Sequence, residues 1–533
     1  MKTKLILISS FALAAMAVGC SKDEGSHSEN QGGSQANIAY LAVSVEAEGT
    51  RAQGENSGTK EEGTVSTAYA VTFDASYQKL NVVALTVGTT GSDLTVGADG
   101  KPTATPSKAI SVSPNTRYLM MVLNPSQNLL SAMSGAASFA DFQQKVLDDV
   151  ADLTIDDRFT MINRGAISGT SMGNMHEMAL ADCQNKVFTA ADGGLSVDAA
   201  KAAAANAPVA IPVVRLVAKV GLGNALGTPL AGIVENGASC EFVAWQFNTV
   251  NKTYLPYSTI TSYVDQDGVL VTDNRIYRKD GNYEGTENPA NEFYFLKNSD
   301  NVAGAGNEIA WRTTSTGYVL ENTMAPNAQL QGYTTRMVVK ARYTPAGITV
   351  NDTWAQYVKE GVEGAPETIT SLETKMASDT DLASLLTSIA AELQYTSAAE
   401  LIAALNADDG TNAQLNNVGY IAAKYSLGGA GTESYVRIYR KSECYYDLLI
   451  QHNSNLPEPM VLGKYGVVRN NWYTLNVTKV SKPGTSFIPD PTDPSIVDPS
   501  NPDPADPNED TNSYISVTVT IMPWTLWQQD IEI

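Results

Sequence analysis

Apolar and polar residues alternate most regularly near the two ends of the chain. Residues 38–46 read IAYLAVSVE, in which Leu41, Val43 and Val45 are separated by small residues. Residues 513–533 carry a second alternation, whose apolar positions are Ile515, Val517, Val519 and Ile521. A period of two residues is typical of a β-strand with one apolar face. We therefore predict a strand at each end of the chain.

Shorter apolar runs predict a series of strands between these ends. They lie at 68–73, 80–87, 117–123, 211–222, 241–247, 293–297, 336–343, 434–438, 445–451 and 472–480. Many short strands separated by turn residues are typical of antiparallel β-sandwiches. We predict an all-β chain with two antiparallel β-sandwich domains, residues 52–207 and 208–482, which meet near Pro208.

Three segments have helical rather than strand-like patterns. Residues 141–150 place their apolar side chains at helical spacing, and residues 198–207 are alanine-rich, as a helix or a linker would be. Residues 379–407 are rich in Ala and Leu, and Ser397 with Glu400 has the spacing of a capping box. We predict small helical insertions, with a helical pair at 379–407.

A stretch rich in proline and aspartate, residues 483–512, separates the second domain from the terminal strand at 513–533. Proline removes backbone donors and favours extended polyproline II. The acidic residues between 490 and 510 have no basic residue among them, so their repulsion should extend the stretch further. We predict a solvated tether that leaves the terminal strand without a nearby partner, which suggests pairing with another copy of the chain.

The first residues form an export signal. Lys2 and Lys4 precede an apolar run at 5–18 that is too short to span a membrane comfortably. The run ends in AVGC at Cys20, which resembles the lipobox of bacterial lipoproteins, and the following SKDE resembles the surface-export signal of Bacteroidetes lipoproteins. The alternative is an ordinary secretory signal, residues 1–20, with an incidental cysteine. No later apolar run reaches the ~18 residues of a membrane helix, so we expect lipid to be the membrane anchor.

Arg51 follows the first predicted strand within the polar, turn-like segment EGTRAQG. Exposed loops of small polar residues are preferred sites of proteolysis. A cut between Arg51 and Ala52 would release the propeptide, residues 21–51, together with its strand. The alternative is an ordinary surface arginine in a hairpin loop.

Removal of the first strand would leave a groove, and the last strand of another copy could fill it. A groove vacated by residues 38–46 would accept a strand through main-chain hydrogen bonds, with alternate side chains setting the register. Full burial of each of the four apolar tail residues contributes roughly 1.5–3 kcal/mol. Because donor and groove lie on different surfaces, the repeated contact gives a filament rather than a closed dimer.

Composition and motifs argue against catalysis. The net charge of −22 argues against binding nucleic acid or anionic lipid. The sequence lacks nucleotide-binding, nucleophile-elbow and zinc-protease motifs, and its three histidines have no ligand spacing, so we predict no enzyme, no metal and no cofactor. The segment DQDG at 265–268 fits no calcium loop and predicts a hairpin turn, while a His176–Cys183 dyad has no supporting context.

The cysteines give no clear disulfide framework. If Cys20 is lipidated, Cys183, Cys240 and Cys444 remain, and they form at most one disulfide or stay as buried thiols.

Taken together, these features resemble the shaft fimbrillins of Bacteroidales type V pili, most of all those of the minor (short) fimbriae of Porphyromonas. The resemblance covers the organisation of the chain from end to end. The segments that carry it are the lipobox at Cys20, the strand and arginine at 38–51, VVRLVAKV at 213–220, WYTLNV at 472–477 and VTVTIMPW at 517–524. The long Pro/Asp tether and the insertion at 379–407 depart from the family pattern.

The resemblance implies two transthyretin-like sandwich domains and a lipoprotein precursor at the outer membrane. It implies cleavage after Arg51 by an Arg-specific surface protease and donor-strand exchange between identical subunits, with the tail as donor and Leu41, Val43 and Val45 in the excised strand. Accessory tip and anchor pilins and host or bacterial surface receptors are the expected further partners. The implied role of the cell-surface fimbria is adhesion, biofilm formation and virulence.

Other functions stay open at this point. The chain is alternatively a monomeric surface lipoprotein that binds glycans or host ligands, or a tip or anchor pilin of the same system. The intact tail favours a shaft subunit.

Overall fold

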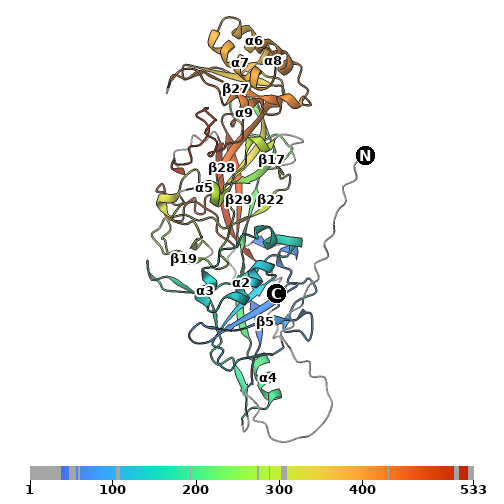
Figure 1. Ribbon diagram of the computed structural model, residues 1–533, viewed down its shortest axis with the longest axis vertical. Helices are drawn as coiled ribbons and strands as arrows, with labels where there is room; N and C mark the ends of the chain where they lie inside the picture. Colours follow the sequence, from blue (N-terminus) through green and yellow to red (C-terminus); the bar gives the residue numbers. More distant parts are fainter. Residues whose placement is uncertain are drawn as a thin grey trace, which may run out of the picture.

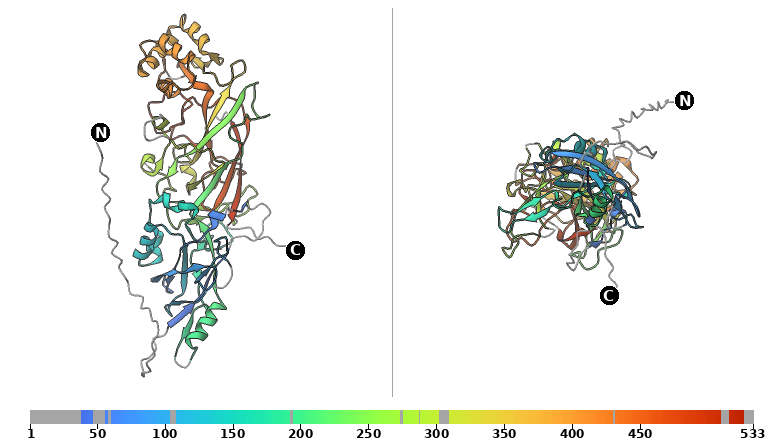
Figure 2. Two further views of the ribbon diagram at one scale, coloured as in Figure 1. Left: turned by 90° about the vertical axis from the view of Figure 1, so that its right-hand side faces the viewer. Right: turned by 90° about the horizontal axis from the view of Figure 1, so that it is seen from below.

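The structure is a computed structural model, and it describes residues 38–46, 56–57, 60–103, 108–191, 194–272, 275–286, 288–301, 309–429, 431–508 and 515–525. The molecule is long and narrow in both side views, with the N-terminal sheets towards one end and a group of helices at the other (Figure 1 and Figure 2). Most of its regular elements are β-strands. This confirms the prediction of a mostly β chain with small helical insertions.

The first unit is built around one large sheet. Its strands follow in the order β2 (Val43–Glu46), β15 (Val209–Arg215), β10 (Met161–Asn163), β9 (Tyr118–Leu123), β4 (Ala68–Phe73) and β5 (Lys79–Leu85), with β13 (Ala181–Asp182) paired to β9. A small sheet of β14 (Phe188–Ala190), β1 (Ile38–Leu41) and β8 (Ile110–Val112) shares its core. Neighbours in both sheets are antiparallel, except that β2 and β15 are parallel.

Short helices complete this unit. They are α2 (Gln127–Gly135), α3 (Phe139–Gln143), the 3₁₀ helix η1 (Val150–Asp157) and α4 (Val197–Ala205). The helix expected at 141–150 is wrong in extent, because α3 ends at Gln143 and Val146 is exposed. A capping box formed by Ser138 and Asp141 begins α3 two residues earlier than the spacing predicts. The alanine-rich segment at 198–207 proves to be helix α4.

Two further sheets enclose a second core. One has the order β22 (Thr316–Leu320), β16 (Val217–Leu222), β29 (Asn471–Val480), β30 (Ile515–Thr525) and β3 (Asn56–Ser57), and the other has the order β17 (Ser239–Asn248), β23 (Arg336–Thr344) and β28 (Glu443–Leu449). Trp245 from one sheet and Tyr473 and Leu475 from the other are fully buried in this core. The single strand expected at 211–222 is wrong, because the chain passes from one unit to the next at Leu216 and divides the run into β15 and β16.

Helices cover a small sheet at the far end of the molecule (Figure 1). The sheet pairs β24 (Trp354–Lys359) with β25 (Val362–Glu363), β26 (Glu367–Thr368) and β27 (Tyr435–Tyr439). Against it lie α6 (Ile369–Met376), α7 (Thr380–Glu392), α8 (Ala398–Asn406) and α9 (Val418–Ala422). The predicted helical pair at 379–407 corresponds to α7 and α8, and the Ser397 hydroxyl caps α8 by accepting from the Glu400 N–H at 3.2 Å.

The remaining elements are short. They are β6 (Val87–Gly88), β7 (Leu94–Thr95), β11 (Ala166–Ser168), β12 (His176–Met178), β18 (Val250–Asn251), β19 (Thr259–Thr261), β20 (Tyr277–Lys279), β21 (Phe293–Tyr294), α1 (Lys60–Gly63), α5 (Pro289–Glu292), and the 3₁₀ helices η2 (Asn298–Asn301), η3 (Pro326–Ala328), η4 (Ala413–Leu415) and η5 (Arg440–Ser442).

Candidate functional site at the two chain ends

The predicted N-terminal strand lies inside the first unit. β1 runs antiparallel between β14 and β8, so it has a hydrogen-bonded neighbour on each side. After Ala42 the chain continues as β2, which runs parallel to β15 and places Val43 opposite Val209 and Val45 opposite Ile211. The segment therefore fills a slot that three strands line.

Both faces of this segment are buried. Leu41, Val43 and Val45 have no solvent exposure and belong to the large core of the first unit. Tyr40 and Ala42 point to the opposite side, where they join a second cluster with Ala200 and Ala204 of α4 and Ala190 of β14. A strand buried on both faces cannot leave without opening the core of this unit.

The chain that follows is fixed again at α1. Glu62 is 1% exposed and its carboxylate bonds Lys219 Nζ at 2.7 Å and the Tyr318 hydroxyl at 2.6 Å. Its main-chain carbonyl accepts from Arg215 Nε at 3.0 Å. The segment between β2 and α1, which includes Arg51 and Ala52, thus joins two firmly held parts. Cys20, Arg51 and Ala52 themselves lie outside the described residues.

The C-terminal strand has a partner within the same chain. β30 runs antiparallel to β29, with Val517 opposite Val477, Val519 opposite Leu475 and Ile521 opposite Tyr473. Ile515 is buried, while Val517 and Val519 are half-buried at the margin of the second core. The expectation that this strand lacks a nearby partner is therefore wrong for the single chain.

The reason lies in residues 483–508, which we call the strap. The strap is not a solvated polyproline tether as predicted, because it folds back along the second unit and buries Phe487, Ile488 and Ile496. Thr485 pairs with Tyr445 through two main-chain bonds of 2.9 Å. At its far end, the Asn508 N–H donates to the Gln329 carbonyl at 3.0 Å. The strap thereby returns the chain to the edge of β29.

Repeated Asp-Pro turns explain why the strap folds despite its prolines and acidity. Asp490, Asp493 and Asp498 each accept two bonds, from the N–H and the hydroxyl of the Thr or Ser two residues later, at 2.6–2.9 Å. These side chains stabilise turns that proline already favours. Asp498 also pairs with the buried Arg437, whose Nε lies 2.9 Å from its carboxylate. Local bonds and this ion pair offset the repulsion on which the prediction rested.

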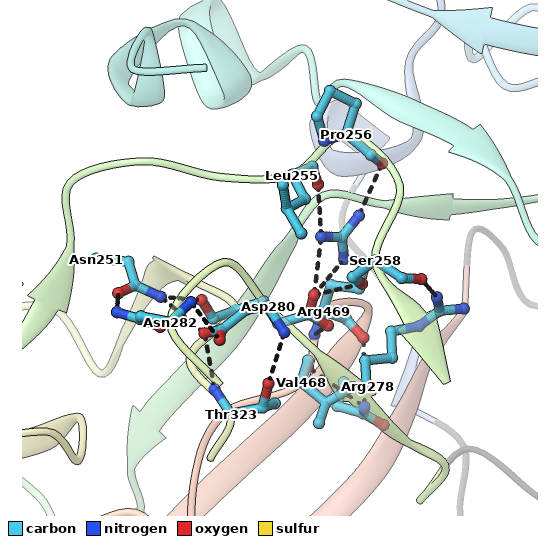
Figure 3. A network of polar contacts seen from close by, with 12 residues as sticks. Asn251, Leu255, Pro256, Ser258, Arg278, Asp280, Asn282, Thr323, Val468 and Arg469 are labelled. Atoms are coloured by element: carbon cyan, nitrogen blue, oxygen red, sulfur yellow. Dashed lines mark hydrogen bonds and ion pairs between the residues drawn. The ribbon is translucent and has the colours of Figure 1, made fainter. Parts of the chain in front are cut away.

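A buried polar network joins the first and second units through Glu177, and Figure 3 shows the part of it that lies in the second unit. Glu321 accepts from the Ser258 hydroxyl at 2.6 Å and from Arg469, whose guanidinium also donates to the Leu255 and Pro256 carbonyls. Arg278 donates to the Ser258 carbonyl and pairs at 2.9 Å with Glu177 on β12 of the first unit. Burial alone would raise the pKa of Glu321, but Arg469 and Arg278 hold it below its ordinary value.

Asp280 belongs to the same network, but no Lys or Arg among the described residues forms an ion pair with its carboxylate. Its carboxylate accepts from the Thr323 N–H at 2.9 Å and from Asn251 Nδ2 at 3.0 Å (Figure 3). Burial raises the pKa of Asp280 to about 7, because hydrogen bonds from neutral groups only partly compensate the lost solvation. None of these network residues could be predicted from the sequence, since they are single polar or charged positions without a motif.

The other candidate chemistry does not assemble in the described residues. Cys183 is buried and desolvation raises the pKa of its thiol to about 12, while His176 is exposed and bonds the Asn174 carbonyl through Nδ1. Cys183, Cys240 and Cys444 are all free, buried thiols. Asp265 accepts from the N–H groups of Asp267 and Val269 at 3.0 Å, which is the tight turn that the sequence predicts.

The described ranges of the chain contain no group of three or more His, Cys, Asp or Glu side chains that could hold a metal ion. None of the helices in these ranges is long and apolar enough to cross a membrane.

Comparison with known proteins points to fimbriae for the C-terminal part of the chain. Residues 437–530, from within β27 to the end of β30 and beyond, match the family described as "Major fimbrial subunit protein type IV, Fimbrillin, C-terminal". This match relates that part to structural subunits rather than enzymes. No curated protein matches the sequence.

Several solved structures resemble the fold remotely. A candidate cell adhesion protein of Parabacteroides distasonis is 12% identical, with a TM-score of 0.37 over 92% of this chain and 100% of that one. A fimbrilin of Porphyromonas gingivalis is 12% identical, with a TM-score of 0.34 over 93% and 99%. The tip fimbrial protein Mfa3 of Porphyromonas gingivalis is 12% identical, with a TM-score of 0.31 over 91% and 100%.

Proposed function

We propose that the chain is the shaft subunit of a surface fimbria, of the kind that forms short fimbriae in Porphyromonas, and that it polymerises by exchange of a β-strand. The observation that carries the proposal is the burial of residues 38–45 on both faces, in a slot lined by β8, β14 and β15. The fimbrillin match over residues 437–530 supports the class of protein.

Removal of the first strand is the activating step in this proposal. A protease specific for arginine cuts between Arg51 and Ala52, where the chain passes from β2 to the part that Glu62 anchors. The cut leaves α1 in place and makes residues 38–46 dissociable. The vacated slot exposes the edge of β15 and the core side chains that Leu41, Val43 and Val45 covered.

The tail of a neighbouring subunit supplies a matching strand. Ile515, Val517, Val519 and Ile521 repeat the two-residue period of the excised segment. The intervening serine and threonines are small enough to face the side where Tyr40 and Ala42 lie in the uncut chain. Main-chain bonds to strands on both sides then stabilise the contact.

Before assembly, the tail rests on its own subunit. On β29 its valines are only half-buried, whereas the corresponding residues of β1 and β2 have no exposure. Transfer from this position to the slot of a neighbour therefore buries more apolar surface, and the hydrophobic effect favours assembly. Because slot and tail occupy different units, the contact propagates head to tail.

The remaining parts of the chain serve export and organisation. Residues 1–20 direct lipidation of Cys20, and residues 21–51 form the propeptide of an outer-membrane lipoprotein precursor. The two transthyretin-like domains correspond to the first and second units, which meet at Leu216 rather than near Pro208 because β15 pairs within the first unit. Residues 483–512 connect them to the donor, which is residues 513–533. Accessory tip and anchor pilins and host or bacterial surface receptors complete a fimbria that supports adhesion, biofilm formation and virulence.

Two variants of the full-length precursor test this function in cells that carry the protease. Arg51→Ala should yield a folded, lipidated monomer, and deletion of residues 513–533 should yield a cut monomer. The wild type should give a ladder of polymers that resists SDS without heating. Arg51→Lys is the matched control for charge, and it should also stay uncut if the protease requires arginine.

The identity of the N-terminal residue in shed fibres shows whether the chain is cut at the proposed site. Ala52 at the N-terminus supports the proposal. Fibres formed by Arg51→Ala, or normal polymers without residues 513–533, would overturn the roles of the cut and of the tail respectively.

A further inference from the structure

A polar cleft lies where the strap, α9 and β28 meet. Helix α9 lies towards the helical end of the molecule (Figure 1). The volume of the cleft is about 520 Å³, within the range of sites that hold small ligands. Side chains from β23, η5, β28 and the strap line it together with the loop before α9. None of these residues belongs to the strand-exchange site, so the cleft has no part in the proposed assembly.

One side chain in the cleft lacks an internal partner. The Ser486 residue is 9% exposed, and its buried hydroxyl makes no hydrogen bond to any described residue. Close packing holds it there, because a Cβ on Gly419 of α9 would lie 2.0 Å from the Ser486 carbonyl oxygen. A buried hydroxyl without a partner lowers the stability of the fold, and a bound polar ligand would recover that loss.

The lining of the cleft is richer in cationic side chains than the chain as a whole. Lys340, Arg342, Arg440 and Lys441 line it against the carboxylates of Asp409 and Glu443, although the whole protein carries −22. Lys340 is neutralised by Glu443 at 2.7 Å. Arg440 is held by Asp408 through two bonds of 2.7 and 2.9 Å.

Arg342 and Lys441 are less engaged. Arg342 lies 3.9 Å from Glu241 and its side chain is 42% exposed. The Lys441 ammonium makes one long bond of 3.5 Å to the Asp408 carbonyl. Among the described residues, Arg342 thus has only a loose ion pair, and Lys441 has beyond that bond only the longer-range attraction of the Asp408 and Asp409 carboxylates, so both keep donors for an anion in the cleft.

An unusual backbone conformation presents Lys441. Both Lys441 and Ser442 have positive φ, 52° and 61°, a region that side chains other than glycine rarely adopt. Ser442 is held in it by bonds from its hydroxyl to the Asp352 carbonyl at 2.9 Å and from the Thr344 hydroxyl at 3.1 Å. Such strain persists where the surroundings over-determine it, commonly at ligand sites.

We propose that this cleft binds an acidic saccharide, with Arg342 and Lys441 holding its carboxylate or sulfate. The side-chain amides of Asn301, Asn351 and Asn417 also line the cleft and can donate to and accept from sugar hydroxyls. The Ser486 hydroxyl is placed to bond the buried end of the ligand. A neutral saccharide would leave the spare donors of the two cations without an anion, so the cleft should discriminate against it.

Titration of the uncut full-length protein tests the proposal. The probes are 3′-sialyllactose and an unsaturated chondroitin sulfate disaccharide, with lactose as the neutral control. At least one acidic probe should bind at low salt, and added salt should weaken it because exposed charge pairs are screened. Lys441→Gln and Arg342→Gln should each weaken binding about 10-fold or more. The control Lys479→Gln, which changes an exposed lysine of β29 paired with Glu235, should bind like the wild type.

Ser486→Ala separates a ligand contact from a structural one. Loss of an unpartnered hydroxyl should leave the unfolding midpoint unchanged or raise it, while binding falls several-fold. Absence of binding by both acidic probes at millimolar concentration, equal binding of lactose, or unchanged affinity of Lys441→Gln would each overturn the proposal. A chain that fails to polymerise but binds the acidic probe would leave this proposal intact and overturn only the assembly function.

Discussion

The strand-exchange proposal makes a quantitative prediction about the cut chain before it polymerises. A chain that begins at Ala52 lacks Leu41, Val43 and Val45, which have no solvent exposure in the uncut molecule. At roughly 1.5–3 kcal/mol for each side chain, their loss removes about 5–9 kcal/mol. The main-chain bonds to β8, β14 and β15 each add about 1 kcal/mol. Since whole domains are stable by about 5–15 kcal/mol, the first unit should be close to unfolding.

The two units can be followed separately. Trp245 and Trp354 are buried in the second core, whereas Trp472 packs against the core of the first unit, so in a chain with Trp472→Phe tryptophan fluorescence reports mainly on the second part. Amide hydrogen exchange in β8, β14 and β15 reports on the slot. In the cut chain, exchange in these strands should accelerate strongly, while the tryptophan unfolding midpoint changes little.

Peptides added to the cut chain then test what the slot accepts. A peptide of residues 37–47 should restore the slow exchange, and one of residues 513–525 should do the same. The first peptide with Val43→Asp and Val45→Asp is the matched control and should not. Unchanged exchange after the cut, or rescue by the control peptide, would refute the reasoning. Rescue by the first peptide alone would show that the slot exists but that the tail is not its donor.

Three further predictions concern buried polar groups. Glu62→Ala removes the carboxylate that pairs with Lys219, and it should lower the free energy of unfolding in urea titrations by about 3–5 kcal/mol. The control Glu235→Ala removes one member of an exposed ion pair and should lower it by only about 0–1 kcal/mol. Burial raises the pKa of Asp280 to about 7, so the stability from its neutral form is complete below the unfolded pKa of about 4 and falls as the pH rises from there to about 7. Asp280→Asn should flatten this fall between about pH 4 and 7, and an unchanged pH slope would contradict it. Asp498→Ala removes the ion pair with Arg437, so the strap should become sensitive to limited proteolysis. The control Asp503→Ala changes an exposed residue of the strap and should leave the digestion rate unchanged. Equal digestion of both variants would show that the Asp498–Arg437 pair does not hold the strap in place.

The sequence predicts the strands well where burial imposes a period of two residues. Leu41, Val43 and Val45 alternate because one face of their segment meets the large core, and the valines of the tail alternate because one face meets the second core. The helical pair can be predicted equally well, since Leu382, Leu385, Leu386 and Ile389 recur at helical spacing and pack against one sheet.

The strap shows that amino-acid composition alone can predict the wrong structure for a segment. Its prolines and aspartates suggested a solvated chain, yet each of Asp490, Asp493 and Asp498 is followed by Pro and then by Thr or Ser. That triplet is a local signal for a turn, and counting charges alone misses it. The ion pair between Asp498 and Arg437 joins residues that are far apart in the chain, so no local sequence pattern predicts it.

The networks around Glu62 and Glu321 could not be predicted for a similar reason. Each links side chains from several strands through single charged residues that follow no period. These partners can be identified only from the three-dimensional arrangement of the sheets.

The folded strap also bears on how a fibre would respond to pulling. Residues 509–514 alone join Asn508 to Ile515, and so short a segment extends by at most about 3.6 Å per residue. Load arriving through a donated tail would pass at once into the hydrogen bonds that tie Asn508 to Gln329 and Thr485 to Tyr445. A shaft linked in this way would have almost no slack between successive subunits, and it should resist stretching as a stiff rod until the strap itself is peeled from the sheet.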